Sequence, residues 1–206
     1  SVELGMLYSN PSVPVALRRL RDAGAQRIVV MPVFPQYCGA TTGPVFDQVA
    51  AELTRWRWVP ELRFVSDYHD DPGYIEALRT SVESHWTLRG RTQHLLISFH
   101  GIPERYFTKG DPYYCKCQKT ARLLAEELNL PQGAWTMSFQ SRYGPGRWLR
   151  PYTSEVLEGL PRRGVRSATV VCPGFAVDCL ETLDEIDREE LGRIAASIST
   201  PSPSKG

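Results

Sequence analysis

Short, largely apolar runs of strand length alternate with amphipathic helical segments along most of the chain. The runs lie at residues 27–33, 62–66, 94–99, 134–139 and 167–172. The segments around them repeat apolar residues at helical spacing, at residues 10–24, 41–56, 72–86, 114–128, 152–160 and 178–194. A run such as "RIVVMPV" has no polar alternation, which is typical of a strand buried on both faces. This order predicts an α/β protein with parallel sheets and right-handed crossovers.

The polar, basic stretch "TLRGRTQ" at residues 87–93 is the best boundary between two halves of the chain. We expect an N-terminal Rossmann-like half at 1–90 and a C-terminal Rossmann-like half at 91–194. The Pro/Ser-rich stretch at 195–206 is typical of a disordered tail. The two doubly wound halves should face each other across a cleft, with ligands beyond the carboxyl ends of the strands.

Composition excludes several classes of function. A net charge of +1 over 206 residues gives no general electrostatic case for binding nucleic acid or an anionic membrane. The apolar runs are far shorter than the roughly 20 residues of a transmembrane helix. Five cysteines, an odd number without a secretory signal, favour reduced thiols and a cytoplasmic protein, with peripheral membrane contact left open. Neither a Walker lysine loop nor a Gly-x-Gly-x-x-Gly motif is present, so nucleotide binding is not indicated.

The stretch "ISFHGIPERY" places His100 directly after a predicted buried strand. A histidine at this edge of a parallel sheet lies where ligands bind, and its ring can exchange protons near neutral pH. A strand-end histidine can equally be a hydrogen-bonded part of the core. The residue pattern alone leaves both interpretations open.

The predicted helix at 178–194 carries Glu181, Glu185 and Glu189 at intervals of four residues. This spacing places the three carboxylates in one stripe, away from the apolar side of the helix. Such a stripe is commonly a solvated face. It can also attract divalent cations, and no lysine within the stripe offsets the three charges.

Aromatic and basic residues gather near the same predicted edge. The aromatic residues are Phe34, Tyr37, Phe99, Tyr143 and Trp148, and the basic residues are Arg142, Arg147 and Arg150. Aromatic rings can line a narrow pocket for a flat ligand, and arginines can bind the acidic substituents of that ligand. Packing at the rim of the sheet is the equally good alternative.

Four stretches carry a family resemblance: "FPQYCGATTGPVFD", "SFHGIPERYFTKGDPYYC", "TMSFQSRYGPGRWLRPYT" and "CPGFAVDCLETLDEI". In this order and spacing they resemble ferrochelatase, the enzyme that inserts Fe²⁺ into protoporphyrin IX in haem biosynthesis. The resemblance implies two Rossmann-like halves of the chelatase fold with a porphyrin cleft between them. It also implies a bacterial type of enzyme.

The resemblance assigns roles to particular residues. It implies that His100 and Glu181 are the catalytic and metal-binding pair, with His100 as pyrrole proton acceptor or iron ligand. Glu185 and Glu189 would continue a proton or metal relay, and Tyr37, Arg142 and Trp148 would contact the porphyrin. Fe²⁺ is then a substrate, no organic cofactor is implied, and an iron–sulfur cluster is not supported. The expected state is a monomer whose partners are the porphyrin and iron.

Departures from the family pattern lie at both ends. The family's first strand is expected before Ser1, and its closing strand and helix are replaced after residue 194 by "IAASISTPSPSKG". We therefore expect residues 1–206 alone to be poorly soluble and weakly active or inactive, because sheet edges and apolar surface stay open. The alternatives are a chelatase for another tetrapyrrole or metal (coproporphyrin or cobalt), a non-catalytic porphyrin carrier, and an inactive porphyrin-binding fragment.

Overall fold

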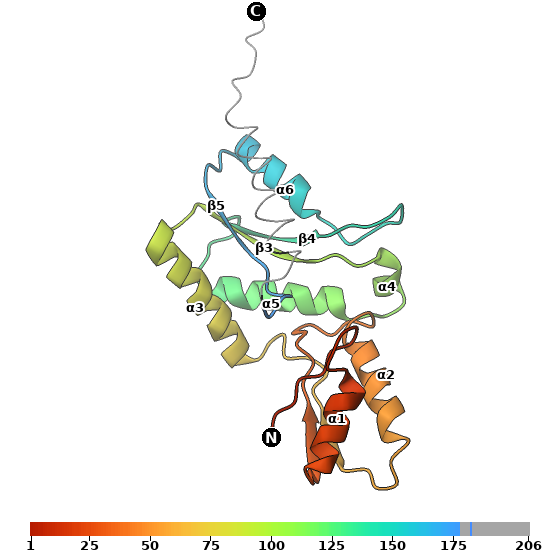
Figure 1. The fold of residues 1–206 in the computed structure, drawn as a ribbon. Helices are drawn as coiled ribbons and strands as arrows, with labels where there is room; N and C mark the ends of the chain where they lie inside the picture. Colours follow the sequence, from red (N-terminus) through yellow and green to blue (C-terminus); the bar gives the residue numbers. More distant parts are fainter. Residues whose placement is uncertain (178–181, 183–206) are drawn as a thin grey trace, which may run out of the picture.

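The computed structural model describes residues 1–177 and residue 182, in an alternating order of helices and strands (Figure 1). The first part holds α1 (Val13–Asp22), β1 (Arg27–Val30), α2 (Thr42–Leu53), β2 (Glu61–Phe64) and α3 (Pro72–Arg89). The second holds β3 (His94–His100), α4 (Glu104–Thr108), α5 (Tyr113–Glu127), β4 (Trp135–Gln140), α6 (Thr153–Gly159), a 3₁₀ turn (Pro161–Arg163) and β5 (Ala168–Val171). The alternation of strands and helices predicted from the sequence is confirmed for the described residues, with α4 as an additional short helix. The predicted helix at 178–194 lies outside these residues.

The strands form two parallel sheets within the described residues. β1 pairs with β2 in the first, and β3 lies between β4 and β5 in the second. The α/β class and the parallel pairing are as predicted. β1 ends at Val30, although the apolar run continues to Val33. Pro32 within that run has no backbone N–H to donate, which favours a strand end at this point.

Helices cover the second sheet on both faces (Figure 1). Leu95, Ile97 and Phe99 of β3 belong to one core cluster together with residues of α5. Leu96, between them in sequence, belongs to another cluster with Leu157 of α6. Successive side chains of a strand point to opposite faces, so β3, which is buried at every position from His94 to Phe99, is covered on both.

The first sheet is covered on one face by α1 and α2. Ile28 of β1 packs with Leu17 of α1 and Val49 of α2. The alternate residues Val29 and Met31 are 64% and 57% exposed. The face of the first sheet opposite α1 and α2 therefore leaves apolar surface open in the described structure. No helix among the described residues combines the length and the hydropathy that crossing a membrane requires.

Helix α3 packs against the second sheet. Its Val82 and Trp86 are buried in the same core cluster as Leu95, and Trp86 Nε1 donates a hydrogen bond of 2.9 Å to Thr169 Oγ1 in β5. The sequence boundary at residue 90 assigns α3 to the N-terminal half by chain order. In the structure, α3 instead packs on the second sheet, which belongs to the C-terminal half. The division of the chain into two halves stays a prediction.

Candidate active site

Loops from both sheets meet beyond the carboxyl ends of their strands. Gln36, in the loop after β1, is buried and donates from Nε2 to Thr120 Oγ1 of α5 at 3.1 Å. Tyr74 of α3 donates to the carbonyl oxygen of Pro173, after β5, at 2.5 Å. Gln36 Nε2 also lies 3.4 Å from Tyr74 Oη, which links the two contacts. The edge where a parallel α/β protein binds ligands is therefore built from both sheets.

His100 is the last residue of β3, in register with Gln140 of β4. Its side chain is half-buried, and its ring centroid lies 6.2 Å from that of Phe175 in the loop after β5. The backbone carbonyl of His100 accepts a hydrogen bond of 3.0 Å from Tyr113 Oη. The predicted position of His100 at the carboxyl end of a buried strand is confirmed, and its role in binding a ligand stays a prediction.

The hydrogen bond of the imidazole defines its tautomer. His100 Nδ1 lies 2.6 Å from the carbonyl oxygen of Gly101. A carbonyl oxygen only accepts, so Nδ1 carries the proton and donates it in this contact. In the neutral ring Nε2 then has the free lone pair, and it is the atom that can take a proton or bind a metal.

Gly101 lies where backbone and aromatic ring come close together. Its N–H donates to the carbonyl oxygen of Gln140 at 2.7 Å. A Cβ at this position would lie 2.8 Å from that oxygen and 3.3 Å from Cε3 of Trp148. Glycine is the residue that permits this approach. The indole of Trp148 is thereby placed beside the residue that follows His100.

Trp148 is held by the segment after His100. The backbone of Leu149 donates to Ile102 at 3.0 Å, and the backbone of Glu104 donates to Arg147 at 2.9 Å. Pro103 and Trp148 form an isolated antiparallel bridge between these contacts. Residues 147–149 therefore run beside residues 102–104 as a short two-stranded ribbon. This pairing places Trp148 beside Pro103 and Gly101. His100 does not line the cavity that contains Trp148, so a shared ligand site for the two residues stays a prediction.

A cavity of about 710 Å³ lies between this ribbon, α4 and the start of α6. Its apolar wall includes Phe107, Tyr114 and Trp148. Its charged groups are Glu104, Arg142, Arg147 and Arg150. The guanidinium carbons of Arg142 and Arg150 lie 5.1 and 4.5 Å from the ring centroid of Tyr152. Arg150 Nη1 also pairs with Glu155 Oε2 at 3.4 Å. Three arginines against Glu104 and Glu155 leave an excess of positive charge, which attracts anions.

The other predicted site residues have different outcomes. Tyr37 is half-buried in the loop after β1, and its Oη would lie 3.9 Å from a Cβ on Gly43. It does not line the cavity that contains Arg142 and Trp148. Glu181, Glu185 and Glu189 lie outside the described residues, so their placement relative to His100 stays a prediction.

Asp111 and Tyr113 support the site, although sequence reasoning did not select them. The carboxylate of Asp111 accepts hydrogen bonds from Gly39 N at 2.8 Å and Tyr113 N at 2.9 Å. The Asp-Pro pair before α5 was the available signal, because aspartate commonly caps the start of a helix. The contact with Gly39, 72 residues away in sequence, has no local signal.

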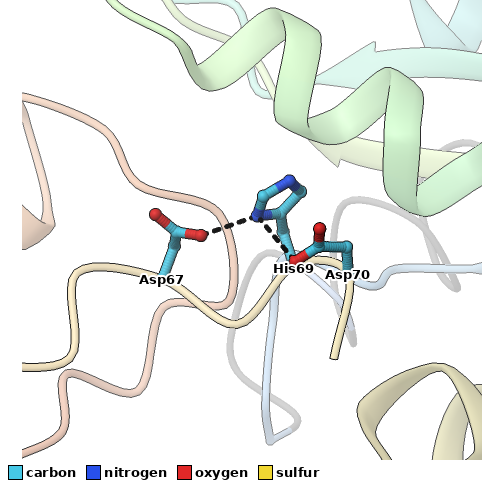
Figure 2. Close-up of side chains that lie close together, drawn as sticks. All are labelled: Asp67, His69 and Asp70. Carbon is cyan, nitrogen blue, oxygen red and sulfur yellow. Dashed lines mark hydrogen bonds and ion pairs between the residues drawn. The ribbon is translucent and has the colours of Figure 1, made fainter. Parts of the chain in front are cut away.

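Asp67, His69 and Asp70 form a second cluster of titratable groups, after β2 (Figure 2). His69 Nδ1 lies 2.7 Å from Asp67 Oδ1 and 3.7 Å from Asp70 Oδ1. The other oxygens of the two carboxylates bond to Lys116 Nζ at 2.6 Å and Lys119 Nζ at 2.5 Å. Because each carboxylate already has an ammonium partner on α5, the cluster acts as an ion-pair network and not as a cation site.

This network should make stability depend on pH. Burial raises the pKa of Asp67, but hydrogen bonds from Lys116 and His69 outweigh burial and hold the pKa below its ordinary 3.8. A carboxyl group with a depressed pKa stabilises the fold above its unfolded pKa, and that stability is lost as pH falls through the folded pKa. We expect Lys116→Met to lower the free energy of unfolding at neutral pH by about 1 kcal/mol.

Urea unfolding, measured once at neutral pH and once at a pH below 3.8, the ordinary pKa of an aspartate, tests this effect. The difference between Lys116→Met and the unmodified chain should shrink on acidification, because protonated Asp67 no longer pairs with an ammonium. Lys119→Met is the matched control. Its pair with Asp70 is more exposed, with side chains 46% and 39% exposed, so its effect should be smaller. A difference that stays constant with pH would contradict the ion-pair role.

The described cysteines are free thiols in different surroundings. Cys38 and Cys117 are buried, Cys115 is exposed and Cys172 is intermediate. Burial is the main cause that raises the pKa of the Cys38 thiol to about 12, so it stays protonated. Cys115 and Cys117 lie near the start of α5 with opposite exposure, the first exposed and the second buried. Cys179 lies outside the described residues.

The fold matches a solved structure. SirB from Bacillus subtilis with Fe³⁺ superposes with a TM-score of 0.68 at 16% sequence identity, over 94% of this chain and 70% of that chain. At this identity the match shows the fold alone. The parallel strands, the covering helices and the ligand edge at His100 define an α/β protein of the chelatase fold.

Sequence comparisons give the family. The family model for ferrochelatase matches residues 1–199. A ferrochelatase of Nitrosococcus oceani is 55% identical over 185 residues, which cover 90% of this chain and 50% of that protein. A ferrochelatase of Thioalkalivibrio sulfidiphilus is 54% identical over 188 residues, 91% of this chain and 51% of that protein. The chain belongs to the ferrochelatase family, and it spans about half the length of these curated relatives.

Proposed function

We propose that this chain is part of a ferrochelatase that inserts Fe²⁺ into protoporphyrin IX to form protohaem. Membership of the family supports the reaction. The observation that carries the proposal is the position of His100 at the carboxyl end of β3, where Nδ1 is bonded to Gly101 and the lone pair of the neutral ring lies on Nε2. A cytoplasmic monomer is the form that we propose for the protein.

The reaction requires a proton acceptor beside the macrocycle. A porphyrin loses two pyrrole protons when it binds a metal, and a neutral imidazole suits this task near neutral pH. In the proposed mechanism His100 Nε2 takes a pyrrole proton or binds the incoming iron. Its Nδ1–H, bonded to Gly101, keeps the ring oriented.

The carboxylates are assigned to the path of the metal. Glu181 is proposed to bind Fe²⁺ or carry a proton, with Glu185 and Glu189 as the relay. Carboxylate oxygen is a suitable donor, because it binds ferrous iron less tightly than thiolate does and therefore releases it more readily. The reaction involves no change of oxidation state, so the proposed mechanism uses no organic cofactor and no iron–sulfur cluster.

The arginine-rich cavity is proposed to bind the carboxylate end of the porphyrin. Trp148 supplies an aromatic face for the flat ring, and Arg142 with Arg150 supplies guanidinium groups for acidic substituents. Their joint contact with Tyr152 keeps two cations on one side of the cavity. Tyr37, in the loop after β1, is proposed to contact the macrocycle from the side of the first sheet.

Metal insertion by the chain, extended at both ends to the length of its relatives, tests the function. We expect Fe²⁺ insertion into protoporphyrin IX, measured by the absorption of the product, to exceed insertion into coproporphyrin and insertion of cobalt. Preference for either alternative would identify a chelatase of another specificity. Tight porphyrin binding without turnover would identify a carrier.

The arginine contacts are tested by binding to the same extended chain. We expect the double variant Arg142→Gln, Arg150→Gln to bind protoporphyrin IX about fivefold more weakly, since exposed ion pairs contribute up to ~1 kcal/mol. Fluorescence quenching of the porphyrin gives the affinity. Protoporphyrin dimethyl ester lacks the carboxylates and is the matched ligand, whose affinity should not change. An equal loss for both ligands would contradict a carboxylate contact.

A further inference from the structure

One carboxylate connects a loop of the first sheet to a helix that covers the second. Gly39 lies in the loop between β1 and α2, and Tyr113 is the first residue of α5. Asp111 Oδ2 accepts the N–H of Gly39 at 2.8 Å, and Asp111 Oδ1 accepts the N–H of Tyr113 at 2.9 Å. Each oxygen thus bonds to a backbone group of a different element.

The connection continues to His100 through the side chain of Tyr113. Tyr113 is 7% exposed, and its Oη donates to the carbonyl oxygen of His100 at 3.0 Å. Burial raises the pKa of Tyr113 well above its ordinary value, so the phenol keeps the proton that it donates. Gly39, Asp111, Tyr113 and His100 therefore form one continuous path.

The approach at Gly39 is tight. A Cβ on Gly39 would lie 3.2 Å from Asp111 Oδ2, closer than ordinary van der Waals contact. Cys38 Sγ lies 3.6 Å from the same oxygen. A side chain at position 39 would therefore push directly on the carboxylate, and this gives a way to disturb the path from its far end.

We propose that Asp111 and Tyr113 are positioning residues that couple the β1–α2 loop to the backbone of His100. This loop also carries Tyr37. The path fixes how the loop of the first sheet is placed relative to the histidine of the second. The inference concerns geometry, and it rests on the proposed function only for the identity of the ligand.

A simpler role for Asp111 is to cap α5. The hydrogen bond to Tyr113 N stabilises the start of that helix by itself. A cap alone predicts that substitutions at Asp111 lower the melting temperature and leave His100 unaffected. A positioning role predicts that a change at Gly39, outside α5, is felt at His100.

The nitrogen and proton signals of the His100 ring, measured by NMR on the chain extended at both ends to the length of its relatives, separate the two roles. We expect Gly39→Ala, Asp111→Asn and Tyr113→Phe each to shift these signals, because each disturbs one contact of the path. Gly159→Ala is the control, since a Cβ there has no atom within 4 Å. Unchanged His100 signals in Gly39→Ala and Tyr113→Phe would overturn the proposal, whether or not Asp111→Asn folds.

Binding of protoporphyrin IX gives a second readout. We expect Asp111→Asn and Tyr113→Phe each to weaken binding about fivefold, which corresponds to the loss of one hydrogen bond. The double variant should be no weaker than the weaker single variant, because both act through one path. If the losses of affinity in the two single variants multiply in the double variant, the two residues act independently and the coupling is contradicted. A chain that binds no porphyrin would count against the proposed function alone, since the NMR signals still decide the positioning role.

Discussion

Replacing His100 with alanine is expected to lower metal insertion by roughly 10²- to 10⁴-fold, the range for loss of a positioned acid–base group. The imidazole lies at the end of β3 with Nδ1 bonded to the carbonyl oxygen of Gly101, so the lone pair of the neutral ring lies on Nε2. Alanine removes the only group of residue 100 that can accept a pyrrole proton or bind iron. The rate of Fe²⁺ or Zn²⁺ insertion, followed by absorbance in the chain extended to the length of its relatives, measures the effect.

The matched control for this variant is His85→Ala. His85 is an exposed residue of α3, and its replacement should leave the rate unchanged. Porphyrin binding by His100→Ala should be reduced much less than turnover, because the proposed carboxylate contacts lie at Arg142 and Arg150. Retention of turnover within a fewfold by His100→Ala would remove His100 from the mechanism.

The second large effect is expected for Gly101→Ala. The added Cβ would meet the Gln140 carbonyl oxygen at 2.8 Å, so the backbone of β3 or β4 must shift. Forcing an extra carbon into a packed site costs roughly 1–3 kcal/mol of unfolding free energy. The same shift should disturb Trp148, whose Cε3 would lie 3.3 Å from the new atom, and thereby weaken porphyrin binding.

Urea unfolding and porphyrin fluorescence together test Gly101→Ala. Gly159→Ala, in α6, is the matched substitution, because a Cβ there has open space and alanine favours helix. We expect it to be neutral or slightly stabilising, with unchanged porphyrin affinity. If both variants have the same stability and affinity, the close approach at Gly101 has no role in holding the site.

The sequence predicted the elements well, because the signals for elements are local. An aspartate directly before a helix that opens with proline is a local signal of a cap, and Asp71 Oδ1 accepts from the N–H groups of Gly73 and Tyr74 at 2.9 and 3.2 Å. Five strands were predicted, and each overlaps a strand of the structure. Their ends were less accurate where a proline or a turn interrupts an apolar run, as at Pro32 after β1.

The sequence predicted only part of the candidate site. His100 was selected because a titratable ring directly after a buried strand is a local pattern, and the family motifs agreed with it. Asp111 and Tyr113 were missed because their roles depend on contacts outside their own segment. The arginine-rich cavity was anticipated only as a group of nearby residues, since its depth depends on the ribbon between residues 102–104 and 147–149.

By itself, the sequence determined the α/β class, the order of the elements, the ferrochelatase family and the histidine at the strand edge. All of these depend on periodicity, caps and motifs that lie within a short stretch of chain. The tertiary structure alone decided that α3 packs with the second sheet, that Trp148 lies against Gly101, and that Asp111 bonds to Gly39. These contacts join segments that are distant along the chain, and only the packing of the sheets and helices brings them together.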